Sequence, residues 1–336
     1  MSIEKALYPV KLKGKFGYIN NNGDMEIEAK FDYADEFNGL YAIVGIGDSF
    51  GFINKEGVII GKPEYDDIYE FSDNMAMVEV NRKKGFVDIQ GDLKVKAIYN
   101  EAYGFSEGLA AVQIDYKWGF IDIDGNIIIQ PQYLDAFGFN EGLALVQYGG
   151  KLGYIDKKGN MIIEPQFDYA YGFSEGMAAV QIGNKYGYIN RNGELAIKAK
   201  YFSTNDFSEG LATVEIKDKY GFINDKGIEI IPHKYDWADS FFEGFAAVAI
   251  GDKYGFIDKA GNEVISVKYD NVDIISEGIV AVEINGKWGY INTENKFIIN
   301  PIFDEAYKFN NGIAKVIEED RTRYINKAGQ YIWKLE

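Results

Sequence analysis

The feature that most constrains the fold of this chain is a repeat of 34 residues that runs along it without insertion or deletion. A glycine marks each copy, and the column consists of Gly17, Gly51, Gly85, Gly119, Gly153, Gly187, Gly221, Gly255 and Gly289, with Arg323 in the tenth place. Loops usually tolerate changes of length, because the entropy of closing them grows slowly. A chain of ten units that never uses this freedom indicates units that stack in a fixed geometry.

Two further columns keep the same step. One is a second glycine, as at Gly125, and the other is an aromatic residue, as at Phe105 and Phe139. We predict that Phe105 and Phe139 are buried anchors and that Gly125 supplies a positive φ in a turn. Glycines of the first column (Gly119, Gly153 and Gly187 among them) lie between large residues in strands, and we expect a side chain of the adjacent unit to pack where their Cβ would stand.

The pattern inside one unit is that of β-structure. Residues 109–114 alternate apolar and polar side chains, which is typical of a half-buried strand. A second strand is predicted over 118–122 and a third over 126–130, ended by Pro131, with an Asx-glycine hairpin turn between them. Residues 132–142 form a connector. Each unit is therefore predicted to be a three-stranded meander plus a connector.

These units predict an all-β repeat protein, an open superhelical, solenoid-like array of ten meanders over residues 1–336 as a single domain. Atypical, polar capping units are expected near residues 1–14 and 313–336, because an open array must keep its ends soluble. A closed β-propeller-like ring is the alternative. It is disfavoured because ten blades exceed the usual four to eight and 34 residues are few for a four-stranded blade.

Charge and composition narrow the partners. The net charge is −17 with a pI near 4.6, which opposes binding to nucleic acid or to an anionic membrane surface. The chain has no cysteine, so disulfides and thiolate metal sites are excluded. No apolar run approaches the 18 residues of a membrane span, and the first residues lack a signal-peptide core. We expect a cytoplasmic protein, with a secreted or surface form as the alternative if a leader was removed.

The motif Lys117-Trp118-Gly119-Phe120-Ile121-Asp122, followed by a glycine three residues later, resembles the bacterial WG (KWG) repeat family. A second copy runs from Lys287 to Asn292. The resemblance covers essentially the whole chain, although most units replace the tryptophan by another residue. It implies a β-rich scaffold and transfers no catalytic residue.

No arrangement of residues in the sequence indicates catalysis or metal binding. The only histidine, His233, has no accompanying partner motif, and we interpret it as a residue at a strand end. The segment Asp122–Asn126 superficially resembles a calcium loop, but other units place lysine at its middle positions, so a hairpin turn is the better interpretation. We therefore expect no enzyme, no metal and no cofactor.

Two charged columns face each other in the sequence, glutamates such as Glu107 and Glu209 and lysines such as Lys117 and Lys219. We predict a ladder of surface ion pairs, each contributing about 0–1 kcal/mol.

The connector holds the candidate binding residues. Aromatic residues occur two positions before the phenylalanine column in four successive units, and acids lie two residues before the first three of them. The candidates are Tyr69, Tyr103, Phe137, Tyr171, Asp67, Glu101 and Asp135. If they face solvent, the rings could stack on sugars or grip a peptide, and the carboxylates could pair with cations; the alternative is that the rings cover the edge of the fold and bind nothing.

The sequence therefore predicts a non-enzymatic binding or scaffold protein that presents an extended acidic surface to a protein partner. The alternative is a protein that binds a carbohydrate or cell-envelope polymer through the aromatic stripe of the connector.

Overall fold

The computed structural model describes residues 5–333, and all regular secondary structure in this range is β-strand. The chain divides into two compact units, one ending at Gly172 and one beginning at Phe173. Each unit contains five separate antiparallel sheets, and the strands of each sheet follow one another in sequence. No helix that could cross a membrane occurs within residues 5–333. The predicted all-β repeat architecture is confirmed.

The first unit has five sheets. Their strands are β1 (Tyr8–Leu12), β2 (Lys15–Ile19) and β3 (Met25–Phe31); β4 (Tyr33–Ala34), β5 (Tyr41–Ile46), β6 (Ser49–Asn54) and β7 (Ile59–Tyr65); β8 (Asp67–Ser72), β9 (Met75–Val80), β10 (Lys83–Asp88) and β11 (Leu93–Tyr99); β12 (Ala110–Ile114), β13 (Lys117–Ile121) and β14 (Ile127–Tyr133); and β15 (Asp135–Asn140), β16 (Leu143–Tyr148), β17 (Lys151–Asp156) and β18 (Met161–Phe167).

The second unit repeats this arrangement. Its strands are β19 (Met177–Ile182), β20 (Lys185–Asn190) and β21 (Leu195–Tyr201); β22 (Ala212–Ile216), β23 (Lys219–Ile223) and β24 (Glu229–Tyr235); β25 (Trp237–Ala238), β26 (Phe245–Ile250), β27 (Lys253–Asp258) and β28 (Glu263–Tyr269); β29 (Asn271–Val272), β30 (Ile279–Ile284), β31 (Lys287–Asn292) and β32 (Phe297–Phe303); and β33 (Glu305–Ala306), β34 (Ile313–Glu318), β35 (Arg321–Asn326) and β36 (Tyr331–Trp333).

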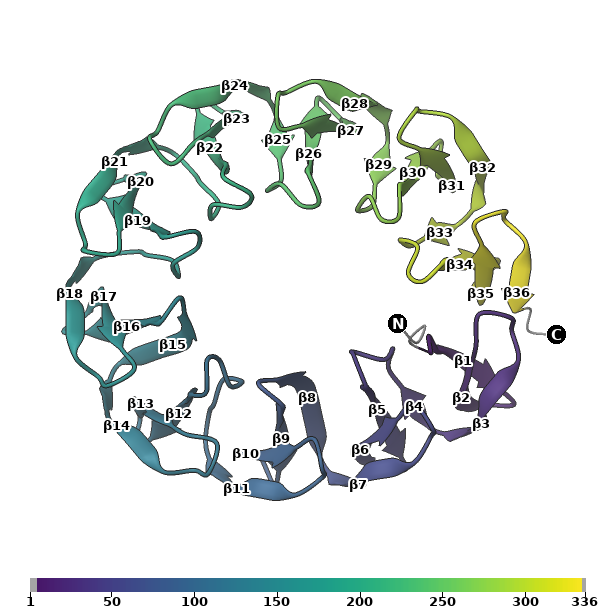
Figure 1. Cartoon of the computed structure of the whole chain (residues 1–336), viewed down its shortest axis with the longest axis horizontal. Coiled ribbons are helices and arrows are strands. Elements are labelled where there is room, and N and C mark those ends of the chain that lie inside the picture. The colour runs from purple at the N-terminus through teal and green to yellow at the C-terminus, as the bar shows by residue number, and fades with distance from the viewer. Residues whose placement is uncertain (1–4, 334–336) are drawn as a thin grey trace. The chain divides into compact units, whose positions relative to one another are not determined.

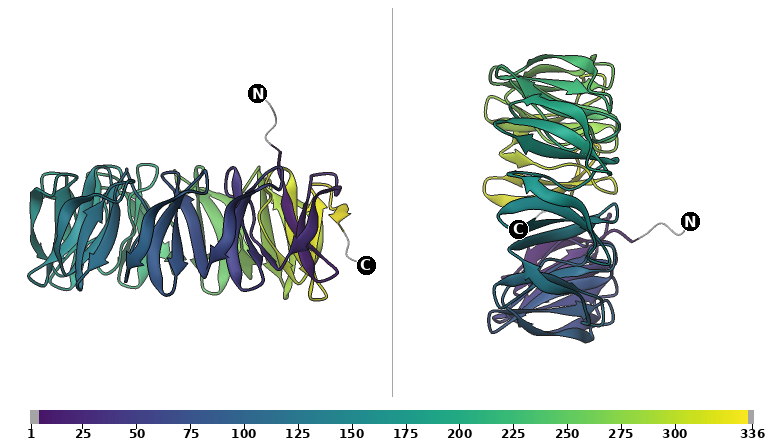
Figure 2. Two further views of the ribbon diagram at one scale, coloured as in Figure 1. Left: turned by 90° about the horizontal axis from the view of Figure 1, so that it is seen from below. Right: turned by 90° about the vertical axis from the view of Figure 1, so that its left-hand side faces the viewer.

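Within each unit the sheets lie side by side along an arc, like the blades of a β-propeller (Figure 1). The first strand of a four-stranded blade lies on the concave side of the arc and the last strand on its convex side, and turns close both ends of every blade (Figure 2). The predicted open solenoid is wrong, because every sheet is confined to its own blade and none continues into the next repeat. The propeller alternative describes the blades correctly.

The predicted connector is the fourth strand of the blade. In six blades it forms a paired inner strand, as in β8 and β15, and in three others it makes only isolated bridges, such as Ala102 with Val112. Thirty-four residues suffice for four strands because the strands of the blade β8–β11 are six or seven residues long and short turns join them. The expectation of a three-stranded unit is therefore wrong for the six four-stranded blades.

The first glycine column is required by a bulge in the outer strand. Trp118 pairs with Tyr133 and Phe120 with Ile129, so a two-residue step in β13 faces a four-residue step in β14. A Cβ at Gly119 would lie 2.5 Å from the carbonyl oxygen of Ile129 and 2.8 Å from the nitrogen of Pro131. The group over the glycine is thus backbone of the same repeat. The prediction that a side chain of the adjacent repeat packs there is wrong for Gly119. It is also wrong for Gly153 and Gly187, which meet the equivalent backbone.

Pro131 does not end the outer strand, which continues to Tyr133. A proline lacks an N–H, and bulges and edge strands are the places in a sheet that tolerate this loss. The proline column therefore lies inside the outer strand, at the bulge.

The second glycine column contacts the neighbouring blade. Gly125 has φ +81° and closes the hairpin turn, as predicted, and its N–H donates to the carbonyl of Asp122 at 3.0 Å. A Cβ at this position would lie 3.4 Å from the side chain of Val95 in the preceding blade. The close approach between neighbouring repeats that we expected at Gly119 occurs at this turn instead.

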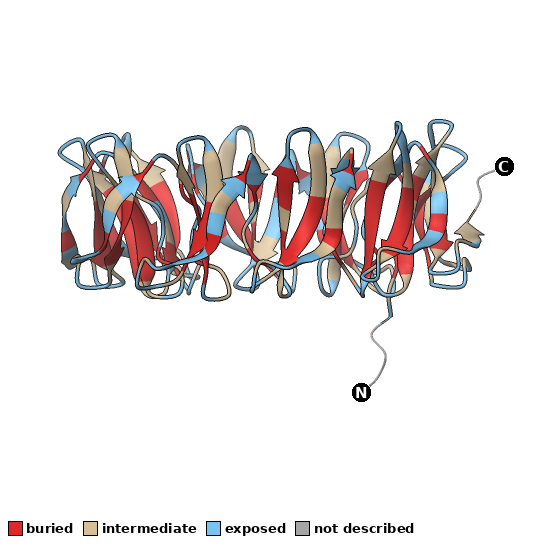
Figure 3. Ribbon diagram, turned by 90° about the horizontal axis from the view of Figure 1, so that it is seen from above, coloured by how far each residue is buried: buried red, intermediate tan, exposed pale blue. Residues whose placement is uncertain are grey.

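The hydrophobic core is shared between successive blades. Phe105 and Phe139 are buried, as predicted, and each packs on an aromatic ring of the blade before it: Phe105 on Phe86 at 4.8 Å and Phe139 on Phe120 at 5.0 Å between ring centroids. Figure 3 shows the buried residues along the strands and the exposed residues at the turns. Each sheet therefore buries its faces against its neighbours.

Polar clamps reinforce this packing. The carboxylate of Glu107 accepts the N–H of Gly142 at 3.0 Å and pairs with Lys157 at 3.0 Å, and both partners belong to the next blade. The same arrangement recurs in the second unit at Glu209 and Glu277. We call these three residues the glutamate clamps.

The predicted ladder between the glutamate and lysine columns is wrong. The lysine column pairs instead with aspartates 17 residues later, as in Lys219 with Asp236. The aspartate also accepts a backbone N–H from a turn of the next blade, at Gly251 for Asp236. The glutamate and lysine columns therefore both form ion pairs, but with other residues and not with each other.

The bulge generates a stability prediction. Gly119→Ala forces a Cβ into backbone and should cost about 1–3 kcal/mol, which corresponds to a melting temperature roughly 3–10 °C lower. Gly104→Ala is the matched control, because a Cβ there would meet only the Cβ of Ser72 at 4.0 Å and its φ is not positive. Thermal unfolding followed by circular dichroism measures both. Equal melting temperatures for the two variants would contradict the role of the bulge.

The glutamate clamps generate a pH prediction. The ammonium group of Lys259, with a smaller contribution from the N–H of Gly244 and against the opposing effect of burial, lowers the pKa of Glu209 from its usual 4.5. A lowered pKa means that the clamp stabilises the fold fully above pH 4.5 and loses this effect as the pH falls through the folded-state pKa. Glu209→Gln should therefore lower the free energy of unfolding at pH 7 by up to about 1 kcal/mol, and with it the melting temperature. In acid, below the folded-state pKa, the substitution should have no effect.

The control for this prediction is Glu263→Gln, an exposed residue of β28. It should leave unchanged the difference in melting temperature between pH 7 and an acid pH below the folded-state pKa of Glu209. A Glu209→Gln effect that persists in acid would show that the carboxylate charge is not what stabilises the contact.

Candidate functional site

From the second blade onward, the inner segment of each blade directs two side chains outward and turns the residue between them toward the blade, as the alternation of a strand requires. In the fourth blade, for example, Glu101 and Tyr103 are exposed and Ala102 is buried. We call the outward residues of the inner segments the inner face of a unit. In the first unit they are Tyr33, Asp35, Asp67, Tyr69, Glu101, Tyr103, Asp135, Phe137, Tyr169 and Tyr171, and in the second Ser203, Asn205, Trp237, Asp239, Asn271, Asp273, Glu305 and Tyr307.

All four rings of the predicted stripe lie on the inner face of the first unit. Tyr69, Tyr103, Phe137 and Tyr171 are 37%, 43%, 38% and 47% exposed. Their exposure answers the question that the sequence left open. Their role in binding stays a prediction.

Several of these rings lie against one another. Tyr103 stacks on Trp118 with centroids 5.1 Å apart and planes at 17°, and on Phe137 at 6.1 Å and 22°. Trp118 is the tryptophan of the repeat motif and is buried. Near-parallel stacking covers ring faces, so the phenol and the ring edges of Tyr103 are what remains open to a partner.

Carboxylates surround the rings and make the inner face electronegative. Burial raises the pKa of the Tyr103 phenol, and the negative charges of Asp135 and Glu101 add to the shift. The phenol of Tyr33 donates to the carboxylate of Asp35 at 2.5 Å, and this hydrogen bond, with burial, raises the pKa of Tyr33 to about 12. Such a surface favours a cation over an anion.

The inner face of the second unit was missed by the sequence analysis. In one of its blades the aromatic residue and the acid exchange places: Trp237 precedes Asp239, whereas Asp67 precedes Tyr69. The same exchange at Tyr33 and Asp35 was the available signal. A search of one repeat column at a time misses this exchange, because the ring moves to the column where other repeats have the acid, and the acid moves to the column where they have the ring.

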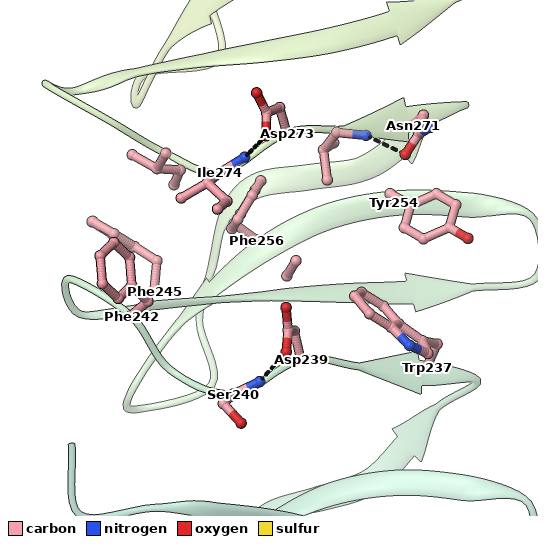
Figure 4. A pocket seen from close by; sticks show the side chains of 13 residues that line it. Trp237, Asp239, Ser240, Phe242, Phe245, Tyr254, Phe256, Asn271, Asp273 and Ile274 are labelled. Atoms are coloured by element: carbon pink, nitrogen blue, oxygen red, sulfur yellow. Dashed lines mark hydrogen bonds between the residues drawn. The ribbon is translucent and has the colours of Figure 1, made fainter. Parts of the chain in front are cut away.

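This exchange accompanies a pocket in the second unit, of about 160 Å³. Its walls come from β25, β26 and β27 of one blade and from β29 of the next, with the loops that follow β25 and β29 (Figure 4). The lining residues are Trp237, Asp239, Ser240, Phe242, Phe245, Ala247, Tyr254, Phe256, Asn271, Val272, Asp273, Ile274 and Ile275. No lysine, arginine or histidine is among them.

The two carboxylates of the pocket are held by their own backbones. Asp239 accepts the N–H of Ser240 at 2.7 Å, and Asp273 accepts the N–H of Ile274 at 2.8 Å. In each case the bond uses Oδ1 and fixes the side chain (Figure 4). Neither carboxylate has a cationic partner among the described residues. Asp273 also lines a second, more open cavity of about 260 Å³ with Trp288, Glu305 and Tyr307.

The remaining candidates of the sequence analysis lie elsewhere. His233 is in the outer strand β24, where its Nδ1 lies 2.5 Å from Glu229, so it is outside the inner face. Asp122 uses Oδ1 to accept the N–H groups of Asp124 and Asn126 at 3.0 and 2.9 Å, which confirms the hairpin turn. Within residues 5–333 no three histidine or acidic side chains form a group that could hold a metal ion.

The fold and the inner face define a repeat protein of β-propeller blades. The model of a WG containing repeat matches it nine times, at residues 16–48, 50–83, 85–118, 118–151, 153–186, 186–220, 220–254, 254–288 and 288–321. The chain belongs to this family, as the motif around Trp118 predicted. No curated protein matches the sequence.

Solved structures resemble the chain in fold. A crystal structure of the eukaryotic initiation factor has a TM-score of 0.62 at 10% identity, over 91% of this chain and 98% of its own. Kluyveromyces lactis Hsv2p has a TM-score of 0.37 at 9% identity, over 67% and 91% of the two chains. The dihydro-heme d1 dehydrogenase NirN has 0.42 at 12% identity, over 78% and 73%. At these identities the first similarity concerns the fold alone, and the other two carry no argument.

The electrostatics of the inner face can be tested at Tyr33. We expect its phenol to stay protonated up to about pH 12, and Asp35→Asn should bring the pKa down toward the usual 10, because the neutral amide removes the negative charge. Nuclear magnetic resonance of tyrosines labelled at Cζ follows the titration, with Tyr33→Phe identifying the signal. Asp48→Asn, an exposed acid in a turn of the same blade, should leave the Tyr33 titration unchanged. A Tyr33 signal that titrates alike in the Asp35→Asn variant would refute the coupling.

Proposed function

We propose that this protein is a non-enzymatic binding protein whose inner face recognises a lysine- or arginine-rich segment of a partner protein. The observation that carries the proposal is the pairing, in successive inner segments, of an exposed acid with an exposed ring. Asp67 with Tyr69 and Glu101 with Tyr103 are examples in the first unit. Carboxylates attract the cationic head groups, and rings accept both the head groups and the methylene stems.

Two lysines of the chain itself support this proposal, because their ammonium groups lie beside a ring of the inner face and near a carboxylate. The ammonium of Lys84 lies 4.7 Å from the ring centroid of Tyr69 and donates to its hydroxyl at 2.8 Å. Lys84 also pairs with Glu79. In the second unit Lys315 lies 4.8 Å from the ring centroid of Tyr307, whose hydroxyl donates to Glu305. An ammonium beside a ring and a carboxylate is thus a contact that this surface already makes.

Carbohydrate binding is less well supported. Sugars stack on open ring faces, whereas Tyr103 uses near-parallel contacts with Trp118 and Phe137. The acids beside the rings favour cations over neutral sugars as well. An enzymatic role lacks an evident centre on the inner face, since the only histidine lies in β24.

A fluorescein-labelled lysine-rich peptide tests the proposal by fluorescence anisotropy. We expect binding that weakens as salt is added, and roughly tenfold weaker binding to Asp67→Asn/Glu101→Gln/Asp135→Asn. The matched control is Glu28→Gln/Glu64→Gln/Glu164→Gln, which removes the same charge from exposed residues of the outer strands β3, β7 and β18. It should change the dissociation constant by less than about twofold.

Two results would oppose the proposal. One is equal weakening by the two triple variants, which would indicate attraction to net charge alone. The other is a soluble oligosaccharide that changes the intrinsic fluorescence and loses this effect in Tyr103→Ala/Tyr171→Ala, with no binding of the peptide.

A further inference from the structure

The pocket of the second unit differs from the ring and acid pairs at Tyr69 and Tyr307 in one respect: it has rings and carboxylates but no ammonium group of its own. At Tyr69 and at Tyr307 a lysine of the chain lies over the ring. The repeat places Tyr254 where the third blade has Lys84, and Ala247 where the last blade has Lys315. Tyr254 and Ala247 both line the pocket.

We propose that this pocket binds one lysine side chain of a partner protein, with its ammonium group at the carboxylate of Asp239, its methylene stem against the aromatic walls, and Asp273 adding negative charge to the lining. This inference rests on the proposed function. It specifies which residue type of the partner is bound and where it binds. It adds a site in the second unit that the sequence analysis did not anticipate.

The size of the pocket favours a single side chain. Sites for drug-sized ligands usually measure about 300–1,000 Å³, and this cavity measures about 160 Å³. A bare metal ion fits poorly, because aromatic and aliphatic groups such as Phe245, Phe256 and Ile275 form much of the lining. A flexible apolar stem that ends in a charge matches a lining of this kind.

The charges of the pocket are arranged for a cation. Asp239 and Asp273 come from the inner segments of two adjacent blades, and each is fixed through Oδ1 by the next backbone N–H. The second oxygen of each carboxylate has no hydrogen-bond partner among the described residues. Two fixed carboxylates with no cation of their own attract a positive group, and the neighbouring low-dielectric ring surfaces strengthen that attraction.

The pocket also exposes apolar surface that a lysine stem would cover. Trp237, Phe242 and Ile274 are exposed at its rim. Figure 4 shows Trp237 and Tyr254 on one side of the cavity and Phe242 with Phe245 on the other. Burial of this surface adds affinity without selecting for charge, so the selectivity for an amine must come from the two aspartates.

A small amine tests the site directly. Protein labelled with 5-fluorotryptophan gives one fluorine resonance for each of its 4 tryptophans, and Trp237→Phe identifies that of Trp237. We expect n-butylammonium, the lysine side chain without its backbone, to shift the Trp237 resonance saturably. The neutral n-butanol should bind at least tenfold more weakly.

Two variants define the contacts. Asp239→Asn/Asp273→Asn keeps the Oδ1 acceptors but removes both charges, and should weaken n-butylammonium binding at least about tenfold. The matched control, Glu28→Gln/Glu64→Gln, removes two charges from exposed residues of the outer strands β3 and β7 and should leave n-butylammonium binding unchanged. Ala247→Lys supplies the lysine that the last blade carries at position 315, and should abolish binding by filling the pocket.

The outcomes separate this proposal from the proposed function. No saturable shift of Trp237, equal shifts by n-butanol, or unchanged binding in Asp239→Asn/Asp273→Asn would overturn the lysine pocket. In that case the proposed function stands if the lysine-rich peptide still depends on Asp67, Glu101 and Asp135. If n-butylammonium binds here and the peptide does not depend on those three acids, the pocket stands and the proposed role of the first unit's face fails.

Discussion

Each blade of this protein can bury its hydrophobic faces only against the blades beside it, and the rest of the structure depends on this constraint. Phe105 reaches Phe86 of the preceding blade, and Phe139 reaches Phe120. One sheet of three or four short strands has too little interior of its own to be stable in water. The packing between blades must therefore be the same at every junction within a unit, and the repeat of fixed length follows from it.

The remaining regularities of the repeat serve that packing. A bulge in the outer strand places backbone over Gly119, and the turn at Gly125 approaches Val95 of the neighbouring blade. The glutamate clamps join turns of successive blades at their exposed ends. Each contact is of modest energy. Repeated at junction after junction, these contacts hold the spacing that the core requires.

This rigid packing leaves the inner segments free to vary. Their outward side chains lie at the surface rather than inside the core, so acids and rings can exchange places there while the packing between blades is kept. Tyr33 with Asp35, Asp67 with Tyr69 and Trp237 with Asp239 are different arrangements of the same two groups. Where a lysine of the chain is added, as at Lys315, its ammonium group lies over the ring. Where Ala247 stands instead, the pocket has no ammonium group of its own.

The sequence by itself determined the all-β repeat, the hairpin turn at Asp122 and Gly125, the buried anchors Phe105 and Phe139, and the family. These features depend on local patterns, since alternation, turn residues and column identity are properties of neighbouring residues. Only the tertiary structure decided that the connector is a fourth strand, that backbone covers Gly119, and that Glu107 pairs with Lys157. It also decided that Asp239 and Asp273, 34 residues apart, line one pocket. These facts depend on how one blade lies against the next, and packing between blades leaves no signal in the residue pattern of a single repeat.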